Sequence, residues 1–430
     1  MKAFDRIIGY ETVKNELYQI IDMFKNSEMY KEMGAKLPKG VLLYGPPGMG
    51  KTMLAQALIE ECNEKTFVIR KNKDESNTIK EIKEVFEQAA QEKSAIILID
   101  DLDKFSDSND VDVDAIAFVA VQAGIDSVKD KNVLVIATIN NYAKLPRSLK
   151  RNGRFDRKIG LKSPTNEDAY NIIKYYLSTK RVAKDINYED ISKMISYTSC
   201  ADLETIINES AIYATYARKE NIEIEDIVKA YLRDQYDIPD ENTKCSDEEA
   251  GVTALHEAGH AVIAEAIKKG SVGFMSIQTS GRSSAGGFTH LCEEFTRRPE
   301  HILISLGGKA AVELYHQGRC ASGCQSDLGK AIDMLRAGIT TSGSMGIAQL
   351  DASTQEFPKT SEDYKSRNEA VVHAELERYL FMARDILIKN KDFLFKIAES
   401  LKEKKNLLYS DVQAIRESVK VEEVSQSAIT

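Results

Sequence analysis

Apolar residues in the first third of the chain occur in short runs that alternate with amphipathic stretches, from residue 40 to residue 159. Uninterrupted apolar runs of this kind are typical of strands in a parallel sheet that helices cover on both faces. The pattern therefore predicts an α/β domain. Strands are expected at residues 41–44, 66–69, 95–99 and 133–137, with helices at 52–62 and 79–90.

From residue 163 the strand pattern stops and a helical periodicity replaces it. Helices are expected at 166–179, 188–196, 201–219 and 224–233. The stretch 237–245 is polar and contains Pro239, so we interpret it as a linker. These changes divide the first half of the chain into an α/β domain at 1–162 and an all-helical unit at 163–236.

A second helical domain is expected to begin at Ser246. Ser246 followed by Glu249 is the signature of a capping box at a helix N-terminus, and Gly270 supplies the end of that helix. A glycine-rich interval with strand character, 272–291, interrupts the helices, which then resume to about residue 419. The last two predicted segments are this domain at 246–419 and a polar tail at 420–430.

The charge balance is that of a globular protein without a nucleic-acid partner. Lys and Arg number 58 against 67 Asp and Glu, a formal net charge of −9, whereas phosphate binding needs a cationic surface. The six cysteines form no C-x-x-C pair, which is typical of reduced thiols in a cytosolic protein. The chain opens without a signal peptide, and no apolar run approaches the roughly 20 residues of a membrane helix. We therefore expect a cytoplasmic protein with no membrane span of its own.

The segment 45–52 fits the phosphate-binding pattern G-x-x-x-x-G-K-[ST]. It follows a predicted strand and opens a predicted helix, which is the context that the pattern requires. Its glycines let backbone N–H groups face a phosphate, and the helix N-terminus adds a positive dipole end. Lys51 is expected to reach the β- and γ-phosphates of ATP, and Thr52 to hold Mg²⁺. The expected nucleotide contacts here are Gly45, Pro46, Pro47, Gly48, Met49, Gly50, Lys51 and Thr52.

Polar residues that follow the next apolar runs fit the same nucleotide site. Asp100 ends a buried strand, where a carboxylate can hold Mg²⁺ through water, and Asp101 is a candidate to orient the attacking water. Asn140 follows another apolar run, at a position beside the γ-phosphate in such sheets. Arg154 and Arg157 could stabilise charge on the nucleotide of a neighbouring subunit. Taken alone, these two arginines are better explained as solvated surface residues.

A possible metal site lies inside the helix that begins at Ser246. His256 and His260 are four residues apart, which places both imidazoles on one helical face, and Glu257 can take a proton from a zinc-bound water. The alternative is a pair of structural histidines. Catalytic zinc needs a third protein ligand, and spacing alone leaves that ligand open. The candidates for the third ligand are His290, His301, His316, Asp327 and Asp333.

The order of these motifs resembles that of the FtsH family, ATP-dependent zinc metalloproteases of the AAA+ class. The resemblance extends from about Phe4 to Glu417. It rests on the phosphate loop, on the His-Glu-x-x-His helix and on shorter matching segments between and around them. The shorter segments are Gly9 within 7–9, then 37–43, 151–157, 201–203, 307–311 and 323–328.

This resemblance implies an AAA+ α/β ATPase domain with a helical lid, followed by a mostly helical zinc metalloprotease domain. It implies ATP, Mg²⁺ and Zn²⁺ as cofactors, Gly9 as part of the nucleotide site, and Asp327 as the third zinc ligand. It further implies a homohexameric ring in which Arg154 and Arg157 reach into the neighbour's nucleotide site. Polypeptide substrates would be pulled through the pore and cut, with the segment 286–291 pairing with the substrate backbone.

Three departures from the family pattern refine this expectation. Family members usually carry an N-terminal membrane anchor, and this chain begins at the motor. Asp101 stands where the family has Glu, so its carboxylate is shorter by about 1.5 Å, and misplacement of about 1 Å can slow a reaction a hundredfold. The interval 70–80, where a pore loop is expected, holds no aromatic residue. Two alternatives follow: a peptidase whose ATPase mainly assembles or gates the ring, or an ATP-dependent chaperone or assembly factor with little proteolysis.

Overall fold

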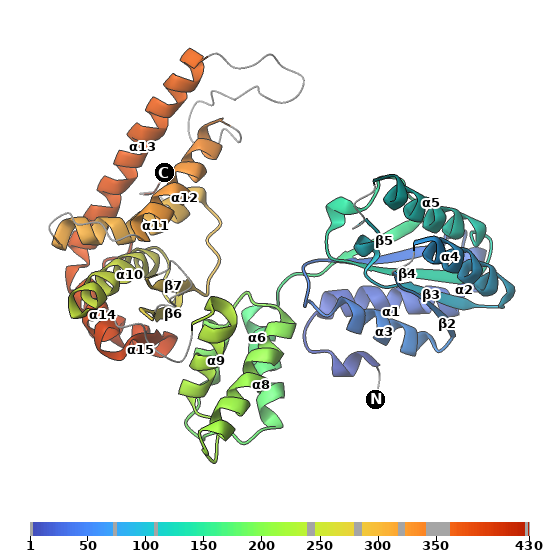
Figure 1. Ribbon diagram of the computed structural model, residues 1–430, viewed down its shortest axis with the longest axis horizontal. Coiled ribbons are helices and arrows are strands. Elements are labelled where there is room, and N and C mark those ends of the chain that lie inside the picture. The colour runs from blue at the N-terminus through green and yellow to red at the C-terminus, as the bar shows by residue number, and fades with distance from the viewer. Residues whose placement is uncertain are drawn as a thin grey trace. The chain divides into compact units, whose positions relative to one another are not determined.

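The chain forms two compact units in the computed structural model (Figure 1). The residues that the structure describes are 3–71, 75–106, 111–238, 246–278, 286–316, 323–340, 362–425 and 429. The first unit comprises Met1–Tyr176 with Tyr197–Thr205, and the second comprises Leu177–Ser196 with Ile206–Thr430. Among the described residues, no helix combines the length and the apolar character that crossing a bilayer requires.

A five-stranded parallel sheet is the centre of the first unit, with strand order β2-β3-β4-β1-β5. Its strands are β1 (Gly40–Tyr44), β2 (Lys65–Ile69), β3 (Ala95–Ile99), β4 (Val133–Ile139) and β5 (Phe155–Gly160). Every residue of β3 and β4 is buried, as their uninterrupted apolar runs predict. The edge strand β5 was not among the predicted strands, because only two of its six residues are buried and it has no apolar run.

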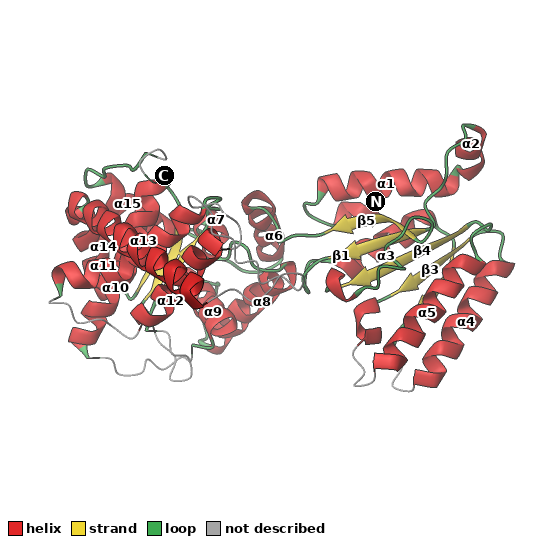
Figure 2. Ribbon diagram, turned by 90° about the horizontal axis from the view of Figure 1, so that it is seen from above, coloured by secondary structure: helices red, strands yellow, loops and turns green. Residues whose placement is uncertain are grey.

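Helices cover both faces of this sheet, as Figure 2 shows. Helices α1 and α3 pack on one face, and α4 and α5 pack on the other. The bounds are η1 (Ala3–Arg6), α1 (Glu11–Lys25), α2 (Ser27–Glu32), α3 (Lys51–Cys62), α4 (Glu75–Gln91), η2 (Leu102–Ser106), α5 (Val111–Ser127), η3 (Tyr142–Lys144) and α6 (Asn166–Ser178). The predicted α/β domain is confirmed.

The second unit is mostly helical and encloses one small antiparallel sheet of strand order β7-β6-β8. Its strands are β6 (Val272–Ser276), β7 (Phe288–Leu291) and β8 (Asn406–Leu408). Its helices are α7 (Tyr188–Met194), α9 (Ile224–Tyr236), α10 (Asp247–Ile267), α11 (Arg298–Tyr315), α12 (Gly323–Thr340), α13 (Glu362–Lys389), α14 (Lys391–Lys404) and α15 (Tyr409–Glu417). Helix α8 (Cys200–Tyr216) has residues in both units, as does α6 at its C-terminal end. The predicted fold class, an α/β domain followed by a mostly helical one, is confirmed.

The predicted domain boundaries stay predictions. Most of the expected linker lies outside the described residues, as do residues 426–428 and 430 of the polar tail. Helices α7 and α9, which fall within the predicted all-helical unit at 163–236, share one compact unit with α10. The capping box that the sequence predicts at the start of α10 is present, because the Ser246 hydroxyl accepts a hydrogen bond from the backbone N–H of Glu249.

Helices α10 and α11 touch backbone to backbone at a pair of glycines. A Cβ atom on Gly259 would lie 2.3 Å from the carbonyl oxygen of Gly307, and one on Gly307 would lie 2.6 Å from the carbonyl oxygen of Gly259. Neither backbone can move aside easily, because α10 is buried on nearly all of its length from Ala254 to Ala266. Only glycine therefore allows the two helices to approach this closely.

Gly259→Ala is expected to destabilise the second unit. Overpacking a close helix contact typically costs about 1–3 kcal/mol, which outweighs the roughly 1 kcal/mol that alanine gains over glycine in a helix. Thermal unfolding followed by circular dichroism measures the effect. Gly251→Ala in the same helix is the matched control, since a Cβ there meets nothing within 4 Å, and it should leave the midpoint unchanged or raise it. A Gly259→Ala protein as stable as Gly251→Ala would contradict the close contact.

Candidate functional sites

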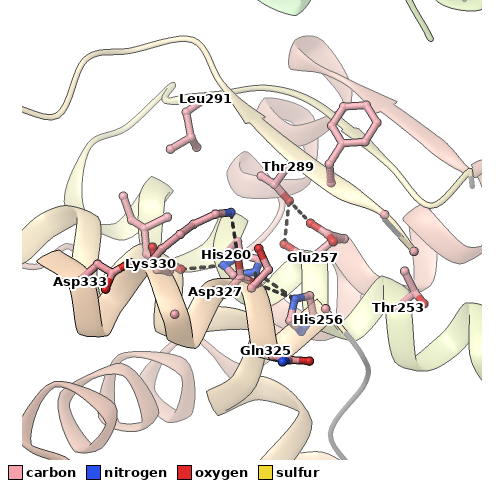
Figure 3. A pocket seen from close by; sticks show the side chains of 18 residues that line it. Thr253, His256, Glu257, His260, Thr289, Leu291, Gln325, Asp327, Lys330 and Asp333 are labelled. Atoms are coloured by element: carbon pink, nitrogen blue, oxygen red, sulfur yellow. Dashed lines mark hydrogen bonds and ion pairs between the residues drawn. The ribbon is translucent and has the colours of Figure 1, made fainter. Parts of the chain in front are cut away.

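Three candidate metal ligands converge between α10 and α12, as Figure 3 shows. His256 and His260 lie one turn apart on α10, and Asp327 lies in the first turns of α12. The Asp327 Oδ2 atom is 3.2 Å from the Nε2 atom of each histidine, and the two Nε2 atoms are 3.1 Å apart. Two nitrogens and one carboxylate oxygen around one point are the donor set of a catalytic zinc site with an open position.

The ring of His260 is held in the orientation that a metal ligand needs. Its Nδ1–H donates a hydrogen bond of 2.6 Å to the carbonyl oxygen of Ile304 on α11. That bond fixes the tautomer, so the lone pair of Nε2 faces His256 and Asp327. Burial lowers the pKa of His260, but the hydrogen bond to Asp327 and the charges of Glu257 and Asp327 outweigh burial and raise it. The three candidate ligands, and the hydrogen bond that orients His260, therefore fit a divalent cation.

The structure separates Asp327 from the other candidates for the third ligand. Among the described residues, His256, His260 and Asp327 form the one cluster with metal-binding spacing. His290 instead lies 2.8 Å through its Nε2 from the Ser196 hydroxyl, and His301 lies 2.7 Å through its Nε2 from a backbone carbonyl oxygen. The candidates outside the cluster are His290, His301, His316 and Asp333. Spacing left this choice open and the family resemblance implied Asp327; the packing of α12 in the second unit brings Asp327 to the two histidines.

The Glu257 carboxylate lies beside the histidines, at the wall of a cavity of about 940 Å³. Glu257 is 5% exposed, and Thr289 on β7 donates a hydrogen bond of 2.8 Å to its Oε2 atom. Burial raises the pKa of Glu257, while the two histidines and the Thr289 hydroxyl act in the opposite direction. A carboxylate with a raised pKa in a cavity beside a metal site is suited to proton transfer at neutral pH.

Two neighbours of the cluster were not among the predicted site residues. Thr289 lies within the predicted substrate-pairing segment, but nothing in the sequence marks it as a partner of Glu257. The Cys324 thiol is buried and lies 3.7 Å from Nδ1 of His256, the ring nitrogen that faces away from the cluster. Both contacts join elements far apart in the sequence, so local spacing could not have found them.

The predicted phosphate loop connects β1 to α3 in the first unit. Gly45, Gly48 and Gly50 all have positive φ, at 149°, 77° and 80°, which explains the need for glycine in this turn. Lys51 is buried, and its Nζ donates hydrogen bonds of 2.8 Å and 2.6 Å to the carbonyl oxygens of Gly45 and Pro46. Burial lowers the pKa of Lys51, while the carboxylates of Asp101, Asp103 and Asp100, which follow β3, act to raise it. The Lys51 ammonium thus contacts the backbone of the loop in which a phosphate is expected to bind.

The two predicted Mg²⁺ ligands lie together at the end of β3. Thr52 donates a hydrogen bond of 3.2 Å to Oδ1 of Asp100, and the Thr138 hydroxyl on β4 donates one of 2.8 Å to the same atom. Thr138 also accepts a hydrogen bond of 2.8 Å from the backbone N–H of Asp101. Thr138 was not predicted, and it orients both acidic residues. The Asp101 carboxylate accepts a hydrogen bond of 2.6 Å from Lys104.

The other predicted nucleotide-site residues have partners within the first unit. The backbone N–H of Asn140 donates to the buried carboxylate of Asp103 at 3.1 Å, an anchor that the sequence did not reveal. Arg154 pairs with Asp126 at 2.9 Å, and Arg157 lies 4.0 Å from Glu16. Gly9 has φ of 75°, and a Cβ there would lie 2.5 Å from a carboxylate oxygen of Asp168. Pro47 and Met49 belong to the loop itself. The roles of these residues toward a nucleotide stay predictions. Of the interval 70–80, where a pore loop is expected, residues 72–74 lie outside the described residues, and residues 75–80 belong to α4, which begins before the predicted helix start at residue 79.

Protonation of His290 is expected to make the second unit less stable in mild acid. Burial lowers the pKa of His290 to about 4, from an ordinary value of 6.5. The unfolded chain therefore binds more protons at this position between these two pH values, so the free energy of unfolding falls as pH drops from about 6.5 to 4. His290→Gln should reduce the fall in unfolding midpoint between pH 7 and pH 5. His373→Gln, at an exposed histidine of α13, is the control, and equal pH dependence in both variants would contradict the expectation.

Comparison with known proteins identifies two family modules in the chain. Residues 41–163 match the ATPase family associated with various cellular activities (AAA), and residues 243–415 match peptidase family M41. The chain is 29% identical to the ATP-dependent zinc metalloprotease FtsH 3 of Symbiobacterium thermophilum, over 97% of this chain and 71% of that protein. It is 32% identical to the ATP-dependent zinc metalloprotease FtsH of Sulfurovum sp., over 81% of this chain and 54% of that protein.

A third relative, the ATP-dependent zinc metalloprotease FtsH of Leptotrichia buccalis, is 28% identical over 98% of this chain and 58% of its own length. Two of these three proteins are therefore matched over less than two thirds of their length. The two modules occur in the order that the sequence motifs predicted. The chain belongs to the FtsH family, with an AAA module followed by an M41 peptidase module.

Proposed function

We propose that this protein is an ATP-dependent zinc endopeptidase. The observation that carries the proposal is the convergence of His256, His260 and Asp327 next to the buried Glu257, in a cavity large enough for a peptide segment. The names of the relatives, all ATP-dependent zinc metalloproteases, support the same activity. The cofactors are Zn²⁺ at the three-ligand cluster and ATP with Mg²⁺ at the phosphate loop.

The side chains of the cavity divide the chemistry of peptide hydrolysis among them. His256, His260 and Asp327 hold the zinc ion, which when bound polarises the scissile carbonyl and acidifies a water molecule. Glu257 takes the proton of the attacking water on its carboxylate and returns it to the leaving amide nitrogen. The raised pKa that burial gives Glu257 makes it a stronger base for the first of these steps.

A polypeptide substrate would lie along strand β7. This strand is an edge of its sheet, in which β6 is its neighbour on the other side. An extended peptide can add to such an edge through main-chain hydrogen bonds, which recognise backbone rather than sequence. Thr289 and Leu291 border the cavity from this strand, so a paired substrate would pass beside the zinc ligands (Figure 3). This arrangement supports unfolded or soluble polypeptides as substrates.

The nucleotide site of the first unit would supply the energy for presenting the substrate. Lys51 and the loop glycines would hold the phosphates, and Thr52 and Asp100 would hold Mg²⁺. Asp101 would position the attacking water, and Asn140 would lie beside the γ-phosphate. In a homohexameric ring, Arg154 and Arg157 would complete the site of the neighbouring subunit. We place this ring in the cytoplasm. The charge balance of the chain does not favour a nucleic-acid partner.

One observation favours a slower motor, and with it an ATPase that mainly assembles or gates the ring. Asp101 is one methylene shorter than glutamate, and its carboxylate is engaged by the Lys104 ammonium at 2.6 Å. A carboxylate that is short and already paired with Lys104 is poorly suited to orient the attacking water. The cleavage of short peptides would then depend on ATP binding, whereas the degradation of folded proteins would be weak.

Glu257→Gln is expected to abolish proteolysis and to leave ATP hydrolysis and zinc content unchanged, because the amide cannot take a proton. Casein degradation measures proteolysis in the presence of ATP, of a non-hydrolysable analogue and of a zinc chelator. The chelator should stop cleavage by the wild type. Glu294→Gln, at an exposed glutamate, is the matched control and should cleave like the wild type. Loss of ATPase activity in Glu257→Gln, with proteolysis kept, would show that the roles are assigned wrongly.

Asp101→Glu is expected to raise the ATP turnover rate, because the longer side chain reaches further toward the attacking water. Asp101→Asn should lower the rate by about 100-fold or more, since it removes the charge that orients that water. A phosphate-release assay on the full chain measures both. Asp130→Glu, at an exposed aspartate, makes the same chemical change away from the site. An Asp101→Asn protein with wild-type turnover would remove Asp101 from the proposed mechanism.

A further inference from the structure

Strand β7 contacts different parts of the molecule through its two faces. Thr289 and Leu291 face the cavity that holds the zinc ligands, as Figure 3 shows. His290, between them, contacts α9 and the segment that follows α7, while the ring of Phe288, which also lines the cavity, stacks on α9. This alternation is the ordinary period of a strand, in which successive side chains point to opposite faces. The strand therefore connects the cavity to helices that contribute no residue to it.

On the cavity side, β7 is tied to the residue that carries the proton. The Thr289 hydroxyl lies 2.8 Å from Oε2 of Glu257 and 3.1 Å from the backbone carbonyl oxygen of the same residue. A glutamate side chain has three rotatable bonds, and a single hydroxyl donor at its carboxylate restricts them. Thr289 is the side chain on β7 that can hold the Glu257 carboxylate toward the zinc ligands.

On the side of α9 and Ser196, aromatic and polar contacts hold the strand in place. The ring of Tyr236, the last residue of α9, stacks on Phe288 with centroids 3.7 Å apart and planes at 17°. Tyr231, one turn or so earlier in α9, meets His290 edge to face at 6.4 Å. The Ser196 hydroxyl lies 2.8 Å from Nε2 of His290. These contacts fix the strand in position and in rotation about its own axis.

The neighbouring strand β6 is held by the same helix pair. Gly273 lies so close to α7 that a Cβ atom there would be 2.3 Å from the carbonyl oxygen of Lys193. Lys193 also forms an ion pair of 2.9 Å with Glu293, two residues beyond the end of β7. Phe274 on β6 contacts Tyr231 edge to face at 5.6 Å. Strand β7 is thus supported both by its own contacts with α9 and Ser196 and by its neighbour β6. These supports fix the position of the Thr289 hydroxyl.

We propose that Thr289 is a positioning residue for Glu257, and that Tyr236 and Ser196 act on the same carboxylate through strand β7. The proposal rests on the proposed peptidase function. Tyr236 and Ser196 lie outside the segment 243–415 that matches the peptidase family, so the peptidase site extends into helices that precede that module. Misplacement of a reacting group by about 1 Å can cost about a hundredfold in rate, which sets the size of the expected effect.

The first test compares Thr289→Val with Thr289→Ser in the full-length protein, with a short quenched-fluorescence peptide as substrate. Valine keeps the shape of threonine without the hydroxyl, whereas serine keeps the hydroxyl. Thr289→Val should lower kcat by about 10- to 100-fold with little change in KM, because the carboxylate is misdirected while the peptide edge is intact. Thr289→Ser should cleave close to the wild-type rate. Zinc content and the unfolding midpoint should match those of the wild type in both.

The second test removes the contacts on the side of α9 and Ser196. Tyr236→Ala and Ser196→Ala should each lower kcat, and the decrease at Tyr236, the larger of the two, should be about 10-fold. Tyr236→Phe should keep most of the wild-type kcat, because the stack on Phe288 remains. Tyr216→Ala makes the same change at a tyrosine of α8 that is 86% exposed, and it should leave kcat unchanged. ATP hydrolysis is measured on every variant and should not change.

The outcomes separate this inference from the proposed function. If Thr289→Val cleaves like the wild type, Thr289 does not position Glu257. If Thr289→Val is impaired but Tyr236→Ala and Ser196→Ala are not, the support from α7 and α9 is refuted. If the Tyr236→Ala protein does not fold, the Ser196→Ala variant still tests the support of β7, and Thr289→Val with Thr289→Ser still tests the role of Thr289. A wild-type protein that carries zinc yet cuts neither peptide nor casein would refute the proposed function instead.

Discussion

The backbone contact between α10 and α11 is the constraint on which the arrangement of the three candidate metal ligands depends. Gly259 and Gly307 allow the two helices to touch, and this proximity brings the carbonyl oxygen of Ile304 to within 2.6 Å of His260. The next residue of α11, Gly308, lies against the ring of His256, where a Cβ would be 2.4 Å from Cε1. One pair of close-packed helices thus orients both imidazoles. A larger residue at any of these glycines would push the rings away from the point at which Asp327 meets them.

The end of the same helix is fixed by a buried charge. Glu265 is fully buried, and its carboxylate accepts hydrogen bonds from the backbone N–H groups of Gly270 and Val272 at 2.9 Å and 3.0 Å. Arg416 of α15 lies 3.3 Å from the same carboxylate. An unpaired charge in this place would be costly, so the pair and the two backbone donors define how the chain turns from α10 into β6. That turn places β6, and β7 beside it, next to the candidate zinc ligands.

A single carboxylate has a comparable position in the first unit. Asp100 accepts hydrogen bonds from Thr52 on α3 and from Thr138 on β4, which brings the phosphate loop and two strands of the sheet to one oxygen atom. In both units, then, the side chains proposed to be catalytic lie where elements distant in the sequence meet. The cores supply the rigidity: β3 and β4 are completely buried, and so is most of the zinc-ligand helix. Rigid supports of this kind hold reactive groups within the tolerance that catalysis requires.

The sequence by itself determined what is local. The phosphate loop, the His-Glu-x-x-His spacing and the cap at Ser246 are patterns within a few residues, because helical and turn geometry fix neighbours at short range. The two-domain fold class followed from hydrophobic periodicity for the same reason. Spacing left five candidates for the third ligand, and resemblance to the family named Asp327, which lies 71 residues from His256. Only the tertiary structure brought Thr289 to Glu257 and Thr138 to Asp100, because such contacts depend on how helices and strands pack, and packing distance leaves no periodic trace in the sequence.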